Sequence, residues 1–318
     1  MKPTTVLSRL VLLYCLLCLT LSLAGCGDHR DEPTTKPPAQ NKQTPAPATR
    51  LLIGLIPEQD IFEQRERYAP LANYISEKAG VTIELKILTR YGNIITNFVD
   101  DKLDGAFLGS FTFALLHKKL DIEPIARPVS LDGTSTYYGM IFVRKDSGIH
   151  SGLSMKNKRF VFVEQATMAG YLLPLHYFKE EDIADYHSWF SETYFSGTHA
   201  DSIMDVLDKR ADIGAAKSTV FTRLAERNKR IAAELMILAK SPEVPENALS
   251  LRGDLDPVLK NKIKDTLLTM DTDSGGKFVL ERFGARKFIE TNDQDYQVVY
   301  QYAEEIGLDL AAYTYQNQ

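Results

Sequence analysis

Small and hydroxyl-bearing residues recur where an apolar, strand-like segment gives way to a helical one. There are four such junctions, at Gly109–Thr112, Ala166–Gly170, Ser196–Asp201 and Lys217–Thr219. The amino end of a helix presents N–H groups without intrahelical partners and the positive end of the helix dipole, so it binds anions. Taken singly, each junction is better explained as an ordinary helix cap, and the third has the spacing of a capping box. Four of them in one chain favour an anion-binding cleft.

The chain carries no catalytic signature. It has no Gly-x-Ser-x-Gly elbow and no phosphate-binding P-loop. Apart from His199 in the third junction, the histidines, among them His117, His176 and His187, are scattered and fit no metal site. We therefore expect a binding protein and not an enzyme, with no metal and no cofactor.

The N-terminal segment has the pattern of a targeting sequence. A short basic region precedes the apolar run Leu10–Leu23, and the run ends in Leu-Ala-Gly-Cys at Cys26. This matches the lipobox of bacterial lipoproteins, in which the cysteine is acylated. An ordinary signal peptide or an anchor helix is the alternative. Residues 1–26 are thus predicted to be a lipoprotein signal peptide, with Cys26 carrying palmitate, and the Pro-rich residues 27–50 a disordered tether.

Cysteine content agrees with this interpretation. The three cysteines are Cys15, Cys18 and Cys26, and the first two lie within the predicted signal peptide. The processed chain would keep only Cys26, so it could form neither an internal disulfide nor a thiolate metal site.

Composition describes an acidic globule. The 318 residues are 44% hydrophobic and carry a formal net charge of −5. This charge argues against a general nucleic-acid partner, which would require a basic face. The length suits one large domain or two modest ones.

The positions that could bind an anion need a scaffold of alternating strands and helices. Strand-like segments are predicted at 51–56, 82–88, 105–108, 140–143, 160–163, 212–216 and 235–238, and a helical pattern ends at Gly80. Such alternation predicts an α/β architecture with mostly parallel sheets. Ligands of open α/β sheets bind beyond the carboxyl ends of the strands, where these junctions fall.

From Leu51 to about Ile289 the chain resembles the binding proteins of ABC importers for phosphonate, phosphite or phosphate. The resemblance rests on the order and spacing of several segments. These are Tyr91-Gly92, Asp104–Gly109, Tyr137-Tyr138, Val143–Ile149, Gly170–Pro174, His199, and Lys240-Ser241-Pro242 with Pro245.

The resemblance implies a two-lobed periplasmic-binding-protein fold of type II. Lobe one would comprise residues 51–142 and 248–318 and lobe two residues 143–247, joined by two hinge crossovers. The implied function is to bind a small oxyanion or organic anion in the inter-lobe cleft and deliver it to an ABC permease. The protein would sit at the periplasmic or extracellular face of a membrane, held by its lipid. A ligand-sensing module that signals to a membrane partner is the alternative.

The resemblance also implies a set of ligand-binding positions. They are Tyr91, Ser110, Tyr137, Thr167, Met168, Ala169, His199, Lys217, Thr219 and Asn247. Family members that bind aminoalkylphosphonates hold the ammonium group with carboxylates, and the matching positions here are the neutral Thr219 and Asn247. Lys217 lies nearby and either faces the cleft, points to solvent or pairs with Asp212. We therefore expect preference for an anion without an amine.

Overall fold

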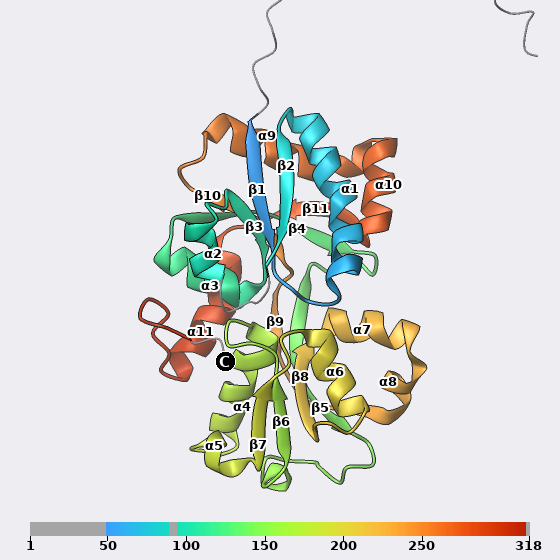
Figure 1. The fold of residues 1–318 in the computed structure, drawn as a ribbon, viewed down its shortest axis with the longest axis vertical. Coiled ribbons are helices and arrows are strands. Elements are labelled where there is room, and N and C mark those ends of the chain that lie inside the picture. Colours follow the sequence, from blue (N-terminus) through green and yellow to red (C-terminus); the bar gives the residue numbers. More distant parts are fainter. Residues whose placement is uncertain (1–48, 89–93, 316–318) are drawn as a thin grey trace, which may run out of the picture. The chain divides into compact units, whose positions relative to one another are not determined.

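The computed structural model describes residues 49–88 and 94–315. The predicted lipidation site Cys26, most of the predicted tether and Tyr91 lie outside the described residues. Within them, the strands form two sheets, each with its own helices (Figure 1). We call each sheet with its helices a lobe.

The first sheet is six-stranded, in the order β11-β4-β10-β3-β1-β2. Strand β1 pairs in parallel with β2 and β3, whereas β10 and β11 are antiparallel to their neighbours. Its strands are β1 Arg50–Leu55, β2 Thr82–Ile87, β3 Gly105–Leu108, β4 Ile122–Ser130, β10 Ala248–Arg252 and β11 Ala285–Glu290. Its helices are α1 Ile61–Ala79, α2 Ile94–Asp100, α3 Ser110–Lys119, α9 Pro257–Leu268 and α10 Ser274–Phe283, with 3-10 turns at Met270–Thr272 and Asp293–Tyr296.

The second sheet is five-stranded, in the order β7-β6-β8-β5-β9. Strand β6 is parallel to β7 and β8, and β5 is antiparallel to β8 and β9. Its strands are β5 Thr136–Arg144, β6 Arg159–Phe162, β7 Glu192–Phe195, β8 Ile213–Lys217 and β9 Leu235–Pro245. Its helical segments are a 3-10 turn Leu153–Met155, the π-helical turn η3 Met168–Leu172, α4 Leu173–Glu180, α5 Tyr186–Trp189, α6 His199–Leu207, α7 Ser218–Arg227 and α8 Lys229–Glu234.

Local sequence explains where the helices begin and end. The Asp60 carboxylate accepts hydrogen bonds from two N–H groups in the first turn of α1, and the helix ends at Gly80 with φ of 67°. Only glycine adopts this left-handed conformation without strain, so it stops the helix cleanly. At α6, the Thr198 hydroxyl accepts from the Asp201 N–H at 3.0 Å, as the capping-box spacing predicts.

The chain passes between the sheets twice among the strands. The first passage, residues 131–135, joins β4 to β5, and the second, Glu246–Asn247, joins β9 to β10. The first differs from our expectation, which kept residues 136–142 with the first lobe. Residues 136–142 belong to β5, which pairs with β8 and β9 of the second sheet. An apolar strand of this kind carries no sequence signal for the sheet it will join.

The C-terminal segment contacts both lobes, although we expected residues 248–318 in the first. Helix α11 (Gln297–Glu305) follows a turn whose Tyr296 ring packs on Phe113 of α3, with centroids 4.2 Å apart. On the other side, the ring of Tyr302 stacks on His176 of α4 at 4.1 Å. The segment therefore forms a third connection between the lobes.

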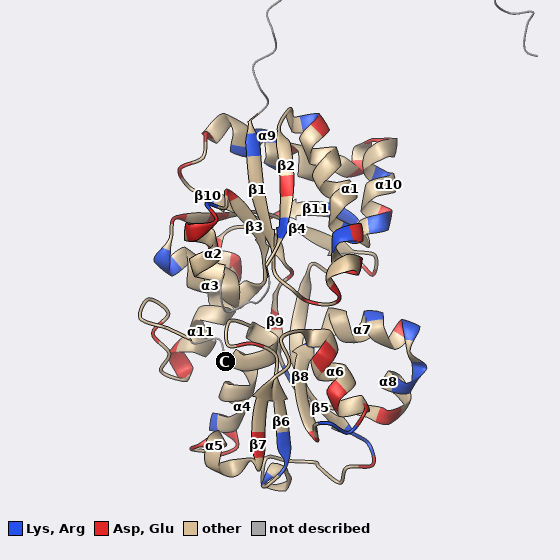
Figure 2. Cartoon of the chain, in the orientation of Figure 1, with Lys and Arg blue, Asp and Glu red and all other residues tan. Residues whose placement is uncertain are grey.

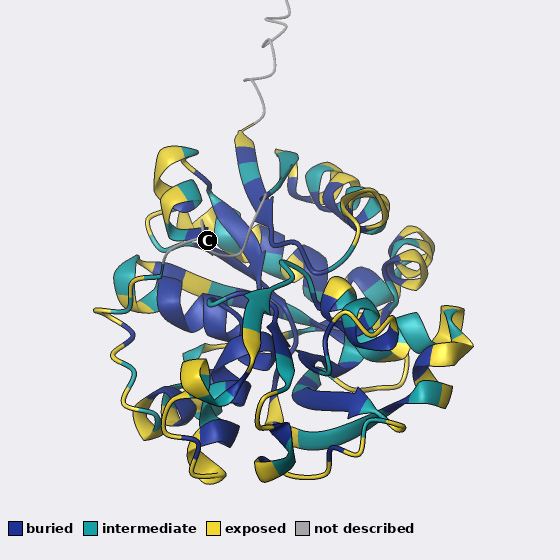
Figure 3. Cartoon of the chain, turned by 60° about the horizontal axis from the view of Figure 1, so that its bottom comes forward, coloured by how far each residue is buried: buried dark blue, intermediate teal, exposed yellow. Residues whose placement is uncertain are grey.

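Apolar burial follows the strands and the helix faces that cover them (Figure 3). Apolar residues recur every three or four positions along α1, which buries Tyr68, Leu71, Ala72 and Ile75 against the first sheet. The central strands β3 and β8 are buried along their whole length. Such strands hold the loops that follow them in fixed positions, which is what a binding site requires.

Candidate functional site

The four predicted junctions converge. One small cavity, which we call the junction cavity, is lined by residues from all four of them, together with the segment after β1 and the β9–β10 passage. Its lining residues are Ile56, Glu58, Gly109, Thr112, Tyr137, Thr167, Met168, His199, Lys217 and Asn247. The cavity measures about 10 Å³, roughly the space that one water molecule needs.

The junction cavity is small because a lysine occupies its centre. The Lys217 side chain is 2% exposed, and its Nζ donates to Glu58 Oε1 at 2.8 Å, to Asn247 Oδ1 at 2.9 Å and to the Glu246 carboxylate. The Tyr137 ring lies 4.4 Å from the same nitrogen. We call Lys217, Glu58, Glu246 and Asn247 the Lys217 cluster. All three N–H donors of the ammonium are therefore satisfied.

The charges of the Lys217 cluster set each other's protonation. Burial alone would raise the pKa of Glu58, but the attraction and hydrogen bond of Lys217 outweigh it and lower that pKa to about 2. Burial likewise opposes the charge of Lys217, yet Glu246 and Glu58 together raise its pKa. Both groups are therefore ionised at neutral pH.

His199 lines the junction cavity in its neutral form. It begins α6 and is buried, and its Nδ1 accepts a hydrogen bond from the Lys217 backbone N–H at 3.3 Å. Burial lowers the pKa of His199 to about 3, with Lys217 and Arg223 adding to the effect. At neutral pH the imidazole can therefore exchange hydrogen bonds with an anion without adding a charge.

The other predicted positions divide into those at the cavity and those beside it. Thr167 and Met168 line it at the start of η3, where the Thr167 hydroxyl donates to the Glu164 carbonyl at 2.7 Å. Ser110 is buried and its hydroxyl lies 2.7 Å from that of Tyr137, which does line the cavity. Ala169 is buried within η3 and does not line it.

Thr219 does not reach the junction cavity. It lies in the first turn of α7, and its buried hydroxyl makes no hydrogen bond among the described residues. The resemblance implied an ammonium-binding position here, and the residue at it is neutral and does not line the cavity.

No motif in the sequence marks either carboxylate of the site. The expectation of a cleft without an acid rests on the neutral Thr219 and Asn247, where the resemblance implies carboxylates. Glu58 follows β1, and the rule that ligands bind beyond strand ends would have pointed to it. The α1 side chain of Gln64 holds this segment by donating to the Ile56 carbonyl at 2.6 Å.

The alternatives for Lys217 are also resolved. It does not point to solvent, because its side chain is 2% exposed. It does not pair with Asp212, which bonds Arg159 at 3.0 Å instead. Lys217 binds Glu246 instead, which directly precedes Asn247 and lies in no motif that would have predicted its role.

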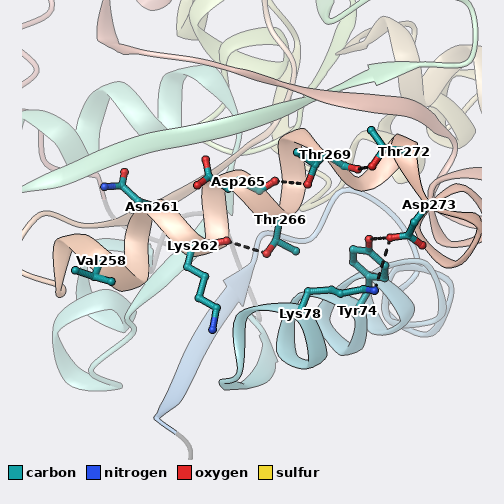
Figure 4. Close-up of a pocket in the computed structure, with 10 residues that line it drawn as sticks. All are labelled: Tyr74, Lys78, Val258, Asn261, Lys262, Asp265, Thr266, Thr269, Thr272 and Asp273. Atoms are coloured by element: carbon teal, nitrogen blue, oxygen red, sulfur yellow. Dashed lines mark hydrogen bonds and ion pairs between the residues drawn. The ribbon is translucent and has the colours of Figure 1, made fainter.

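A larger groove of about 560 Å³ lies on the first lobe between α1 and α9 (Figure 4). Its hydroxyls are already used, because Thr266 and Thr269 donate to carbonyls one turn earlier in their own helix. Tyr74 and Lys78 both contact Asp273. Its described lining residues belong to α1, α9 and the segment that follows α9, and none of them belongs to a strand, so we do not assign the solute site to it.

Two other kinds of site can be examined in the part of the chain that the structure describes. It contains no group of three or more His, Cys, Asp or Glu side chains placed to hold a metal ion. None of its helices is both long and apolar enough to cross a membrane.

Comparisons with known proteins agree with this geometry. Residues 53–296 match the sequence model of a family described as the periplasmic substrate-binding protein of phosphonate ABC transporters. The phosphonates-binding periplasmic protein of Escherichia coli is 25% identical over 76% of this chain and 72% of its own length.

Two solved structures share the fold. One is a binding-protein component of a phosphonate ABC transporter from Pseudomonas aeruginosa, with a TM-score of 0.73 and 23% identity over 80% of this chain and 85% of that one. The other is a Prochlorococcus marinus protein in complex with methylphosphonate, with a TM-score of 0.71 and 21% identity over 81% of this chain and 98% of that one. Two lobes whose strand ends meet around one cavity, and a family match that spans most of both lobes, lead to one conclusion. The chain belongs to the periplasmic substrate-binding proteins of phosphonate ABC transporters, which are binding proteins and not enzymes.

Proposed function

We propose that this protein captures a small oxyanion of the phosphonate, phosphite or phosphate kind, or a small organic anion, and presents it to the permease of an ABC importer. The observation that carries the proposal is the convergence of Lys217, His199 and the helix start at Thr167–Met168 on one cavity. All of them come from the second lobe. A helix start and a buried ammonium are the donors that an oxyanion prefers.

Glu58 acts in this proposal as an internal competitor of the solute. It is the one carboxylate of the Lys217 cluster that comes from the first lobe, and its contact with Lys217 Nζ at 2.8 Å joins the lobes. Separation of the lobes breaks this contact and leaves the ammonium with Glu246 and Asn247. An incoming oxyanion then takes the place of the Glu58 carboxylate.

Entry of the solute requires the lobes to move apart. A cavity of about 10 Å³ admits about one water molecule, so a phosphonate cannot enter the arrangement described. Rotation about residues 131–135 and Glu246–Asn247 would open the site, and closure would trap the solute, as in other hinge-bending binding proteins. Small-angle scattering should give a smaller radius of gyration with a saturating solute than without one.

Selection against amines follows from the same cluster. Glu58 and Glu246 already bind the Lys217 ammonium, so an ammonium group on the solute must compete with one that is covalently held in place. We therefore propose a preference for an anion without an amine. The reason differs from the one given by the sequence, because the acids are present but engaged.

We further propose that the protein is held at the periplasmic or extracellular face of a membrane by a lipid on Cys26. The support is the apolar run followed by Leu-Ala-Gly-Cys. The Pro-rich residues 27–50 would separate the lobes from the bilayer.

Calorimetry with purified protein tests the proposed ligand class. Phosphate, phosphite, methylphosphonate, 2-aminoethylphosphonate and small carboxylates are titrated into wild type, Glu58→Gln and Lys217→Met. Loss of the Lys217 bond should abolish measurable binding. Loss of the internal competitor in Glu58→Gln should strengthen anion binding by about tenfold or more, since a charge-assisted hydrogen bond contributes roughly 1.5–3 kcal/mol.

A matched control is Glu123→Gln, which removes an exposed first-lobe carboxylate that pairs with Lys260. It should bind like wild type. Unchanged or weaker anion binding in Glu58→Gln would contradict the competitor role. Tightest binding of 2-aminoethylphosphonate would contradict the selection against amines.

A further inference from the structure

Helices α1 and α7 face each other across the two lobes (Figure 1). Arg227 of α7 donates to Glu63 of α1 at 2.8 Å, and both side chains are exposed. Residues four apart lie on the same face of a helix. Arg67 therefore lies one turn along α1 from Glu63, and Arg223 one turn along α7 from Arg227. The charge of Arg67 acts on Arg223, and Figure 2 shows basic residues on both helices.

Arg223 has no partner for its buried donors. Its Nε and Nη2 are shielded from solvent and make no hydrogen bond, and the described residues offer it no ion pair. Burial, followed by the repulsion of Arg67, lowers the pKa of Arg223. Buried polar groups are nearly always satisfied, so such a guanidinium requires an explanation.

Arg67 is held within the first lobe by its own contacts. Its Nε donates to the Phe283 carbonyl at 2.7 Å, and its guanidinium lies over the Phe283 ring, 4.4 Å from the centroid. The carboxylates whose charges act on Arg223 are Glu58 and Glu246. Both are hydrogen-bonded to Lys217. The described residues therefore supply no hydrogen-bond acceptor for the Nε and Nη2 of Arg223.

We propose that Arg223 and Arg67 form an oxyanion site between α1 and α7, separate from the Lys217 cluster, where one phosphate, phosphonate or carboxylate group bridges the two lobes. The planar fork of a guanidinium matches these groups and binds them in a bidentate manner. The anion satisfies the orphaned donors of Arg223 and screens its repulsion from Arg67. The site itself does not depend on the proposed function; only the identification of its anion with part of the solute does.

Arginine-selective ¹⁵N labelling and a titration with inorganic phosphate at constant ionic strength test the site. The Nε–H signal of Arg223 is identified by its absence in Arg223→Gln, and that of Arg67 by its absence in Arg67→Gln. Both signals should shift with saturation in wild type. Each variant should weaken phosphate binding at the other arginine by about tenfold or more, whereas Arg227→Gln, one turn outward, should leave it unchanged.

Two further arms identify the source of the anion. Methylphosphonate carries one anionic group and phosphonoacetate carries two. An affinity advantage of phosphonoacetate that disappears in Arg223→Gln assigns the site to a second group of the solute. Saturation of Arg223 by phosphate while methylphosphonate is bound assigns it to a free anion.

Linear, unsaturable shifts, or phosphate affinity that survives in both Arg223→Gln and Arg67→Gln, would overturn the site. Neither result touches the Lys217 binding test, so the two proposals fail separately.

Discussion

Lys217→Met removes the ammonium at the centre of the junction cavity while nearly preserving its volume. Glu58 and Glu246 then remain buried with no cation hydrogen-bonded to them, and Asn247 loses a donor. We expect a strongly destabilised fold at neutral pH, because breaking a buried ion pair from one side leaves the other charge uncompensated.

The structure gives a magnitude for this loss. A Glu58 pKa lowered from 4.5 to about 2 corresponds to about 3 kcal/mol of stabilisation at pH 7, at roughly 1.4 kcal/mol for each pH unit. Removal of one partner from a buried pair typically costs about 3–5 kcal/mol. The two values agree, so the free energy of unfolding at pH 7 should fall by about 3–5 kcal/mol.

The pH dependence of this difference has a definite sign. In wild type the Glu58 pKa is depressed, so its contribution is present above pH 4.5 and is lost as the pH falls toward 2. In Lys217→Met, burial is opposed less and raises the pKa of Glu58 above its unfolded value. The folded variant then gains stability relative to wild type as the pH falls. The gap between the two proteins should be smaller at pH 5 than at pH 7.

Urea unfolding followed by far-UV circular dichroism at pH 7 and pH 5 measures both effects. The control is Lys209→Met, which removes an exposed lysine 3.7 Å from Asp146 and should cost less than about 0.5 kcal/mol. A triple variant with Glu58→Gln and Glu246→Gln added to Lys217→Met should recover part of the loss, because no charge is left unpaired. A Lys217→Met protein within 1 kcal/mol of wild type at pH 7, or a gap that does not change with pH, would refute this account of the cluster.

Three further predictions concern other parts of the protein. Because the pKa of His199 is lowered from 6.5 to about 3, its contribution to folding stability is complete above pH 6.5 and is lost as the pH falls, by about 2 kcal/mol between pH 6.5 and pH 5. His199→Gln should remove this part of the pH dependence of the unfolding free energy measured in urea. The same pH dependence in variant and wild type would disprove it. A Cβ at Gly139 would lie 2.8 Å from the Ala169 Cα, so Gly139→Ala should lower stability by about 1–3 kcal/mol and weaken anion binding in calorimetry, and wild-type values would argue against this tight fit. Cys26→Ser should abolish incorporation of radiolabelled palmitate in cells; equal labelling of the variant would exclude the proposed anchor.

Much of the architecture could be predicted because it depends on local sequence. The apolar segment 51–56, the glycine at the end of α1 and the Thr198 cap of α6 each act within a few residues, and the structure has these features where they were expected. The alternation of strands and helices also predicted that the junctions at strand ends hold the ligand, and these junctions line one cavity. The sheet that β5 joins was predicted wrongly, because its residues are apolar on every side and fit either sheet.

The sequence by itself determined the α/β pattern, the helix starts that we propose bind the anion, and the family. Only the tertiary structure decided what surrounds Lys217. Glu58 and Lys217 are separated by 159 positions in the chain, and Arg67 and Arg223 lie in helices of different lobes. Periodicity reports which face of an element is buried, but it does not report which distant element that face meets. The charge balance of a buried site is the sum over all its neighbours, so it becomes defined only when the lobes are brought together.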